Sequence, residues 1–330
     1  SGYKRYALRA NISRKVTDWL EVGTNQSFTS STTDFANTLS FNTGVVRSAL
    51  LFPPTYGPNM DTTTADELNW LAANPGAYVR SAIDQLNGSN YFSSSFVQIK
   101  FLKNFTFRQN IGLGYNVQDR KSYYGRETQE GKTPINGKAS VGHNTWKSLT
   151  AESILTYDNT FAKIHHVNVM GAFTLESSNW TNDQQVATNF PDDLTGANDM
   201  GRALDKATLS GDKGQQRLAS FLGRVNYTLA DKYILTASFR SDGSSKFTDE
   251  NKWATFLSGA LAWRASEEKF IKDLNIFSNL KFRISYGETG NQGIGSYRIN
   301  SQLDTANFPF GGSLSSGAAD VAWRGPVDPN

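Results

Sequence analysis

Apolar and polar residues alternate along much of the chain, and this two-residue period predicts β-strands with one apolar and one polar face. The clearest example is FTFRQNIGLGYNV at residues 105–117, where most alternate positions are aromatic or aliphatic. About ten segments show this pattern, and they are longer than the roughly five or six residues typical of strands in soluble proteins. The clearest nine lie near residues 4–13, 18–30, 91–102, 104–118, 149–157, 167–175, 219–229, 233–241 and 280–286.

Residues 219–241 predict an antiparallel hairpin. One face of the hairpin is mainly apolar and carries Ala219, Phe221, Gly223, Val225, Tyr227, Tyr233, Leu235, Ala237 and Phe239, whereas Leu218, Leu222 and Ile234 depart from the alternation. The link at residues 230–232 is too short for a parallel return, which needs a crossover of roughly a dozen residues.

The lengths of the connections predict the topology. Short links at residues 14–17, 103 and 230–232 alternate with long polar stretches at residues 31–90, 119–145 and 177–214. A strand of about 11 residues, tilted by about 40°, spans a little under 30 Å, which matches the apolar band of a transmembrane barrel. The pattern therefore predicts an all-β fold, an antiparallel meander that forms part of a large transmembrane β-barrel with long loops on one side.

Aromatic residues and short helices complete this prediction. Tyr227, Tyr233 and Trp263 fall near the ends with short turns and Trp253 near the opposite end, as expected for rings at two membrane interfaces. Residues 64–86 predict two short helices inside a long loop. Thr64 and Glu67 form a capping box for the first helix, and Pro75 lies in the first turn of the second.

Composition excludes several classes of protein. The 330 residues carry a formal charge of +3 without a long basic run, which argues against nucleic-acid binding, and the absence of cysteine excludes disulfides and thiol chemistry. No apolar run approaches the roughly 18 residues of a membrane-spanning helix, and the first residues do not form a signal peptide.

The sequence predicts no catalytic, cofactor or metal site. His143 lies in a predicted polar loop, and His165 and His166 begin a strand, so their side chains point to opposite faces. Glu267 and Glu268 are neighbours in a short turn, and Asp242-Gly243 is interpreted as a turn rather than a calcium site. Candidate substrate contacts are aromatic residues assigned to loops, which can stack on sugar rings: Trp70, Tyr123, Tyr124, Trp146, Trp180, Phe308 and Phe310.

Three stretches carry a resemblance to a known family. They are FLGRVNYTLADKYILTASFRSDGSSKF, NKWATFLSGALAWRASEEKF and NLKFRISYGETGNQGIGSY, and in order and spacing they resemble the SusC/RagA family of TonB-dependent outer-membrane transporters. YKRYALRANISRKVTDWLEVG and NPGAYV resemble an earlier hairpin and the first extracellular loop of the same family. The motif positions, which we expect to be structural, are Arg240, Asp242, Gly243, Ser244, Ser245, Trp263, Tyr286, Gly287 and Gly290.

The resemblance implies that residues 1–330 are the middle part of a barrel of about 22 strands, without its plug and N-terminal domain. A partial barrel has two open edges whose backbone groups lipid cannot satisfy, so this part is not expected to be stable alone in a membrane. The implied function is import of oligosaccharides, or of peptides, across the bacterial outer membrane. The implied partners are a SusD-like surface lipoprotein, TonB with its inner-membrane energising complex, and outer-membrane lipid.

Two other classes of function remain as alternatives. A soluble secreted carbohydrate-binding protein accounts for the aromatic residues but requires polar outer faces. A passive porin or adhesin barrel shares the strand pattern and differs by lacking energy coupling. If the apolar residues of the strands were buried between two packed sheets, the transporter hypothesis would be wrong; the decisive positions are Phe107, Leu113, Val225, Leu235 and Phe282.

Overall fold

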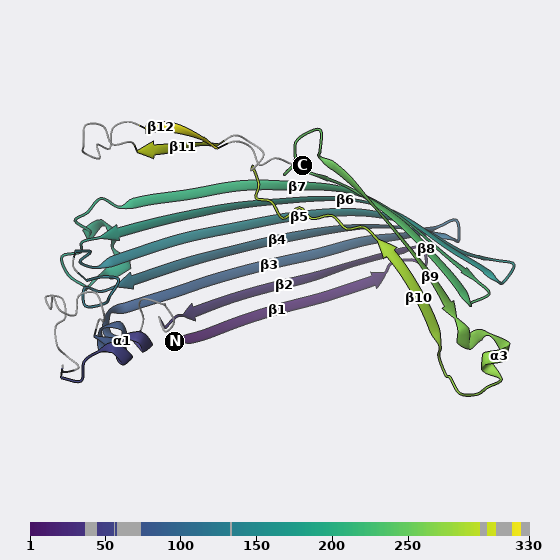
Figure 1. Ribbon diagram of the computed structural model, residues 1–330, viewed down its shortest axis with the longest axis horizontal. Helices are drawn as coiled ribbons and strands as arrows, with labels where there is room; N and C mark the ends of the chain where they lie inside the picture. Colours follow the sequence, from purple (N-terminus) through teal and green to yellow (C-terminus); the bar gives the residue numbers. More distant parts are fainter. Residues whose placement is uncertain are drawn as a thin grey trace.

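The chain forms one large antiparallel sheet whose strands follow each other in sequence order (Figure 1). The structure is a computed structural model that describes residues 1–36, 45–55, 57, 74–132, 134–297, 302–307 and 319–324, the last two stretches as backbone only. The ten strands of the sheet are β1 (Gly2–Lys15), β2 (Leu20–Asp34), β3 (Ala82–Phe101), β4 (Phe105–Tyr124), β5 (Lys138–Phe161), β6 (His165–Thr188), β7 (Thr208–Leu229), β8 (Tyr233–Ser244), β9 (Trp253–Arg264) and β10 (Lys281–Gly287).

Short helices and a second, small sheet lie outside the ten strands. The helices are α1 (Val45–Leu51), α2 (Pro75–Ser81) and α3 (Lys269–Lys272), with 3₁₀ turns η2 (Gly196–Asn198), η3 (Met200–Arg202) and η4 (Ala265–Glu267). Strands β11 (Gln302–Asn307) and β12 (Ala319–Arg324) pair only with each other. The predicted all-β meander is confirmed, and none of the described helices is long and apolar enough to cross a membrane.

The sheet has a turn end and a loop end. At the turn end, links of a few residues join β1 to β2, β3 to β4, β5 to β6 and β7 to β8. Three of these turns hold two consecutive non-glycine residues at positive φ, namely Leu102 and Lys103, Ala162 and Lys163, and Ala230 and Asp231. Consecutive positive φ angles give a hairpin turn whose twist matches that of the strands. The predicted alternation of short turns with long loops is therefore correct.

The strands reach further at the loop end than the sequence predicts. The three long connections cover residues 35–81, 125–137 and 189–207, not 31–90, 119–145 and 177–214. Beyond the apolar band both faces of each strand are polar, so the two-residue period disappears although the backbone pairing continues. The helix that starts at Pro75 ends at Ser81, and residues 82–86 belong to β3. The first predicted helix, near Thr64, lies outside the described residues.

The two faces of the sheet differ as the alternation predicts. Leu113, Val225, Leu235 and Phe282 are exposed and Phe107 is half-buried, and no second sheet packs on them in the described part of the chain. About nine residues of apolar face on a strand tilted by about 40° cover roughly 23 Å, close to the apolar band of an outer-membrane barrel. The opposite, polar face carries Arg108, Glu152 and Arg224 at the same level.

A hydrogen-bonded polar cluster interrupts the apolar face on β2 and β3. The Gln26 side-chain amide accepts from the Tyr91 hydroxyl at 2.6 Å and donates to the hydroxyls of Ser93 and Thr24 at 2.8 and 2.5 Å. The hydroxyls of Thr24 and Ser95 are 2.8 Å apart. These groups satisfy one another, which lowers the cost of placing them among apolar neighbours.

Candidate functional site

A stacked pair of tryptophans lies on the polar face of the sheet. Trp146 on β5 and Trp180 on β6 are directly opposite each other, with ring centroids 5.6 Å apart and an interplanar angle of 15°. Their assignment to loops was wrong, because both strands continue past the apolar band. Trp180 lies over Gly214 of β7, where a β-carbon would come within 2.1 Å of the indole. Gly214 therefore gives the indole the space in which it lies flat.

A polar hollow of about 480 Å³ continues from the tryptophan pair toward the loop end. Asn144 and Asn182 lie two residues further along the same strands as Trp146 and Trp180, and therefore on the same face. The walls consist mainly of hydroxyl, amide and backbone groups: Arg120, Ser122, Ser140, Gly142, Asn144, Asn182, Asp183, Gln184, Ser210, Gly211 and Asp212. The Trp180 indole N–H donates to the Asp212 carboxylate at 3.4 Å, which connects the aromatic pair to the hollow.

The charges in the hollow are few and partly paired. The Arg120 guanidinium donates to both carboxylate oxygens of Asp84, at 2.9 and 2.7 Å. This bond raises the pKa of Arg120 further above its ordinary value. Asp183 and Asp212 add two carboxylates to the lining, and the other lining side chains offer uncharged donors and acceptors beside a wide aromatic surface. Such a site suits a polar, ring-containing ligand better than a strongly charged one.

Tyr123 is a buried side chain and offers no surface for stacking. It is 2% exposed on β4 and packs edge-on against Phe190, with ring centroids 5.5 Å apart. Its hydroxyl donates to Asp193 at 2.8 Å, and burial, followed by this bond, raises the pKa of Tyr123. Tyr124 lies at the end of the same strand, where burial and then Asp84 raise its pKa. Both belong to a strand rather than to a loop, so the sequence assignment was wrong. Trp70, Phe308 and Phe310 lie outside the described residues.

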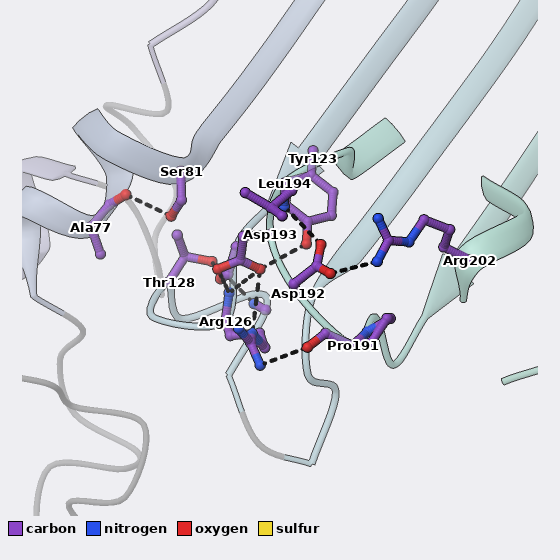
Figure 2. A network of polar contacts seen from close by, with 12 residues as sticks. Ala77, Ser81, Tyr123, Arg126, Thr128, Pro191, Asp192, Asp193, Leu194 and Arg202 are labelled. Atoms are coloured by element: carbon purple, nitrogen blue, oxygen red, sulfur yellow. Dashed lines mark hydrogen bonds and ion pairs between the residues drawn. The ribbon is translucent and has the colours of Figure 1, made fainter. Parts of the chain in front are cut away.

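Polar contacts join the connections of the loop end to one another (Figure 2). Asp193 accepts from the Arg126 backbone N–H at 3.3 Å as well as from Tyr123. Within the connection 189–207, Arg202 donates to Asp192 at 2.5 Å. Under these contacts lies a small core of Tyr123, Ala139, Ala187, Phe190 and Ala197. Helix α2 joins the same body, because the Tyr78 hydroxyl donates to Glu130 at 2.7 Å and Ser81 accepts the Gly125 N–H at 3.1 Å.

The residues of the sequence motif make contacts with one another and with neighbouring strands. The Arg240 guanidinium donates to Asp242 at 2.8 Å and to the Ser220 hydroxyl at 3.1 Å. Asp242 and Gly243 belong to β8, which ends at Ser244, so the interpretation of Asp242-Gly243 as a turn was wrong. Gly243 lies under the Trp253 indole, and Gly290 approaches the Phe256 ring. Of the other motif residues, Ser245 donates its backbone N–H to the Arg217 carbonyl, and Trp263 stacks on Phe282. Tyr286 is exposed on β10, and Gly287 is the last residue of that strand.

The histidines and the glutamate pair have structural partners. His143 lies on β5 and bonds Asp119, so its assignment to a loop was wrong. His165 bonds the Tyr227 hydroxyl and His166 bonds Asp158, on opposite faces of β6 as predicted. Glu267 pairs with Lys272 at 2.6 Å. Among the described residues, no three potential metal ligands of the His, Cys, Asp and Glu types come together.

The hollow was not predicted from sequence. Its lining residues lie in stretches that are polar at nearly every position, so no periodic signal separates residues facing the hollow from those on the other face. Only the two tryptophans carried a usable signal.

Comparison with known proteins gives the family. No family model matches the chain. The chain is 29% identical over 325 residues to TonB-dependent receptor P3 of Formosa agariphila. The aligned residues cover 96% of this chain and 32% of that receptor. TonB-dependent receptor SusC of Bacteroides thetaiotaomicron is 41% identical over 114 residues, which are 32% of this chain and 11% of SusC. The structure of the RagAB peptide transporter superposes with a TM-score of 0.80 over 99% of this chain and 36% of that chain, at 19% identity.

The chain is a relative of the SusC/RagA-type TonB-dependent receptors. The resemblance found in the sequence is therefore confirmed. The chain spans about a third of the length of the curated relatives that it matches over most of its own length. These relatives are receptors and transporters and not enzymes, in agreement with the absence of a predicted catalytic site. The sheet of this chain has the fold of the matched part of the RagAB peptide transporter.

Proposed function

We propose that this chain forms part of the wall of an outer-membrane importer, with its apolar face toward lipid and its polar face toward the lumen. The division of the sheet into these two faces supports the proposal, because a single layer with exposed aliphatic residues on one side requires an apolar solvent. The kinship with TonB-dependent receptors supports coupling to TonB and its inner-membrane energising complex. A SusD-like surface lipoprotein is the expected partner at the loop end.

The cargo that we propose is an oligosaccharide of low charge. The observation that carries this choice is the stack of Trp146 and Trp180 beside the polar hollow. Indole faces bind the apolar C–H surface of a sugar ring, and hydroxyl and amide groups bind its hydroxyls. A peptide is the second candidate, because a solved structure with this fold is that of a peptide transporter.

Binding measurements on the full-length receptor that contains this chain test the cargo. Malto-, xylo- and laminari-oligosaccharides and a mixture of oligopeptides are titrated against the purified receptor by calorimetry. We expect one oligosaccharide series to bind and Trp180→Ala to weaken it roughly two- to tenfold, since a stacking contact on an aromatic ring contributes about 0.5–1.5 kcal/mol and 1.4 kcal/mol corresponds to tenfold. Trp19→Ala is the matched control, because Trp19 is exposed at the turn end, far from the hollow along the strands.

Three outcomes contradict parts of the proposal. If only peptides bind, the cargo is a peptide and not an oligosaccharide. If Trp19→Ala and Trp180→Ala weaken oligosaccharide binding equally, the tryptophan pair is not part of the binding site. Uptake of the bound sugar by cells must stop when a protonophore collapses the inner-membrane proton gradient. Uptake that continues indicates a passive porin.

A further inference from the structure

The connection between β9 and β10, residues 265–280, differs from the other connections of the turn end. It is longer and contains η4 and α3, which Figure 1 shows projecting beyond the ends of the strands. Four large apolar side chains of this connection are exposed: Phe270 by 62%, Leu274 by 54%, Ile276 by 70% and Phe277 by 49%. Exposed apolar residues grouped in this way mark a surface that another apolar phase covers.

Hydrogen bonds fix this connection to the apolar face of the wall. The Glu268 carboxylate accepts from the Tyr233 hydroxyl at 2.7 Å and from the Trp263 indole N–H at 3.3 Å. Tyr233 and Trp263 are opposite each other across β8 and β9, on the face that also carries Leu235, Leu261 and Phe282. Helix α3 is therefore held on the side of the wall that we assign to lipid.

The ends of the connection are also closed. The Ser266 N–H donates to the Leu280 carbonyl at 3.1 Å, and Ala265 is buried. The segment between these points is a short loop with a defined base, and its apolar side chains extend the apolar face past the ends of the strands.

Exposed apolar residues recur at three of the four other turns of the same end. Val16 and Trp19 lie in the β1–β2 turn, Leu102 in the β3–β4 turn and Ile164 in the β5–β6 turn, and all four are exposed. A single protein partner covers one sector of a barrel rim, whereas a bilayer surrounds the wall in every sector. The distribution over four connections therefore favours lipid as the phase that covers these side chains.

We propose that residues 269–277 are an interfacial membrane anchor. This proposal rests on the proposed placement of the sheet in the outer membrane. The anchor inserts Phe270, Leu274, Ile276 and Phe277 at the boundary between phospholipid headgroups and acyl chains. The exposed Lys269 lies among these residues, where its ammonium group reaches the phosphate layer, whereas Lys272 pairs with Glu267. The ligand is the phospholipid surface of the leaflet at the turn end.

Depth-dependent fluorescence quenching tests the anchor in the full-length receptor. The 330 residues contain no cysteine, so a cysteine introduced here is unique within them, and any cysteines elsewhere in the receptor are replaced by serine. Ile276→Cys carries an environment-sensitive fluorophore, and the receptor is reconstituted into vesicles of phosphatidylethanolamine and phosphatidylglycerol. Leu113→Cys reports the middle of the wall, and Asp249→Cys reports the exposed loop end, where the Asp249 side chain is 93% exposed.

The expected result is quenching at Ile276→Cys by nitroxide near the headgroup end of the acyl chain at least about fivefold stronger than at Asp249→Cys, because an interfacial segment lies only about 5–10 Å into the bilayer. Strong quenching of Ile276→Cys by aqueous iodide overturns the anchor, and so does shielding from both quenchers, which indicates a protein partner. If Leu113→Cys is quenched by lipid nitroxide while Ile276→Cys is not, only the anchor fails. If neither is quenched by lipid, the placement of the sheet in the membrane fails as well.

Discussion

The two ends of the sheet are stabilised in different ways. At the loop end, Tyr123 and Phe190 pack in a buried core, and the contacts Arg126–Asp193 and Tyr78–Glu130 join the three long connections to one another. At the turn end, tight turns close each hairpin locally, and the longest connection is held largely through one carboxylate, that of Glu268. The loop end therefore depends on contacts between segments that are distant in sequence, and the turn end depends on local geometry.

This difference follows from what each end has to do. Long connections lose more conformational entropy on ordering than short ones, so they need a buried core of their own to stay in one arrangement. A wall that carries a binding surface near its loop end benefits from such order, because a fixed hollow binds its ligand at a lower entropic cost. Short turns need no core, and their apolar residues remain exposed.

The largest expected effect comes from removing the core of the loop end. Tyr123→Ala in the full-length receptor deletes a buried ring and the hydrogen bond to Asp193, and we expect the loop end to lose about 3–5 kcal/mol of local stability. Hydrogen exchange of residues 125–137 and 189–207 is the measurement. Exchange of these segments is expected to rise by orders of magnitude while the strands near the turn end keep their protection.

Tyr123→Phe is the matched control for this change. It keeps the contact with Phe190 and removes only the hydroxyl, and a hydrogen bond to a charged group contributes about 1.5–3 kcal/mol. If Tyr123→Ala leaves the exchange of both connections unchanged, the loop end has no cooperative core and the contrast between the two ends is wrong.

The sequence predicts the wall of this fold better than its loop end, and the physical reason is periodicity. Where Phe107, Leu113 and Val225 share one apolar face, the alternation is clear and the strands are predicted correctly. Beyond the apolar band, residues such as His143 and Trp146 lie on strand segments whose two faces are both polar. No alternation is required there, so the sequence of these segments resembles that of loops.

The site was predictable only in part for a related reason. An indole is conspicuous in any sequence, and Trp146 and Trp180 were candidates although their place was wrong. Their partnership depends on the register of β5 and β6, and the flat position of Trp180 depends on Gly214 of a third strand. Positive φ at Leu102, Lys103, Ala162 and Lys163 carries no glycine or asparagine signature either, so tertiary pairing imposes these turns.

A smaller effect is expected at the turn end when the carboxylate of Glu268 is removed. Hydrogen bonds from Lys232 and then Tyr233 lower the pKa of Glu268 from 4.5 to about 2. Since the folded pKa is depressed, the stabilisation is fully present above about pH 4.5 and is lost as the pH falls toward 2. Hydrogen exchange of residues 265–275, corrected for the intrinsic rate, is expected to rise over this range.

Glu268→Gln supplies the control for that pH dependence. The amide keeps an acceptor for Tyr233 and Trp263 but has neither charge nor titration, so the variant should exchange faster at neutral pH. Its further rise between pH 4.5 and 2 should be smaller than in the native receptor, because only Glu267, whose pKa the bond from Lys272 lowers, still titrates in this connection with a lowered pKa. If the variant shows the same pH profile as the native receptor, the profile comes from another group. The Glu268 carboxylate then does not hold the connection at the turn end.

The smallest effect is expected for the exposed ion pair of helix α2. The Arg80 guanidinium lies 2.6 Å from Glu127, but the two side chains are 45% and 35% exposed. Water and salt screen such a pair, so Arg80→Ala should change local stability by only about 0.2–1 kcal/mol, and less at high salt. The Tyr78–Glu130 hydrogen bond still joins α2 to the next connection in this variant. Hydrogen exchange of residues 75–81 at low and high salt is the measurement. A loss comparable to that of Tyr123→Ala would mean that surface charge, and not the buried ring, holds the loop end together.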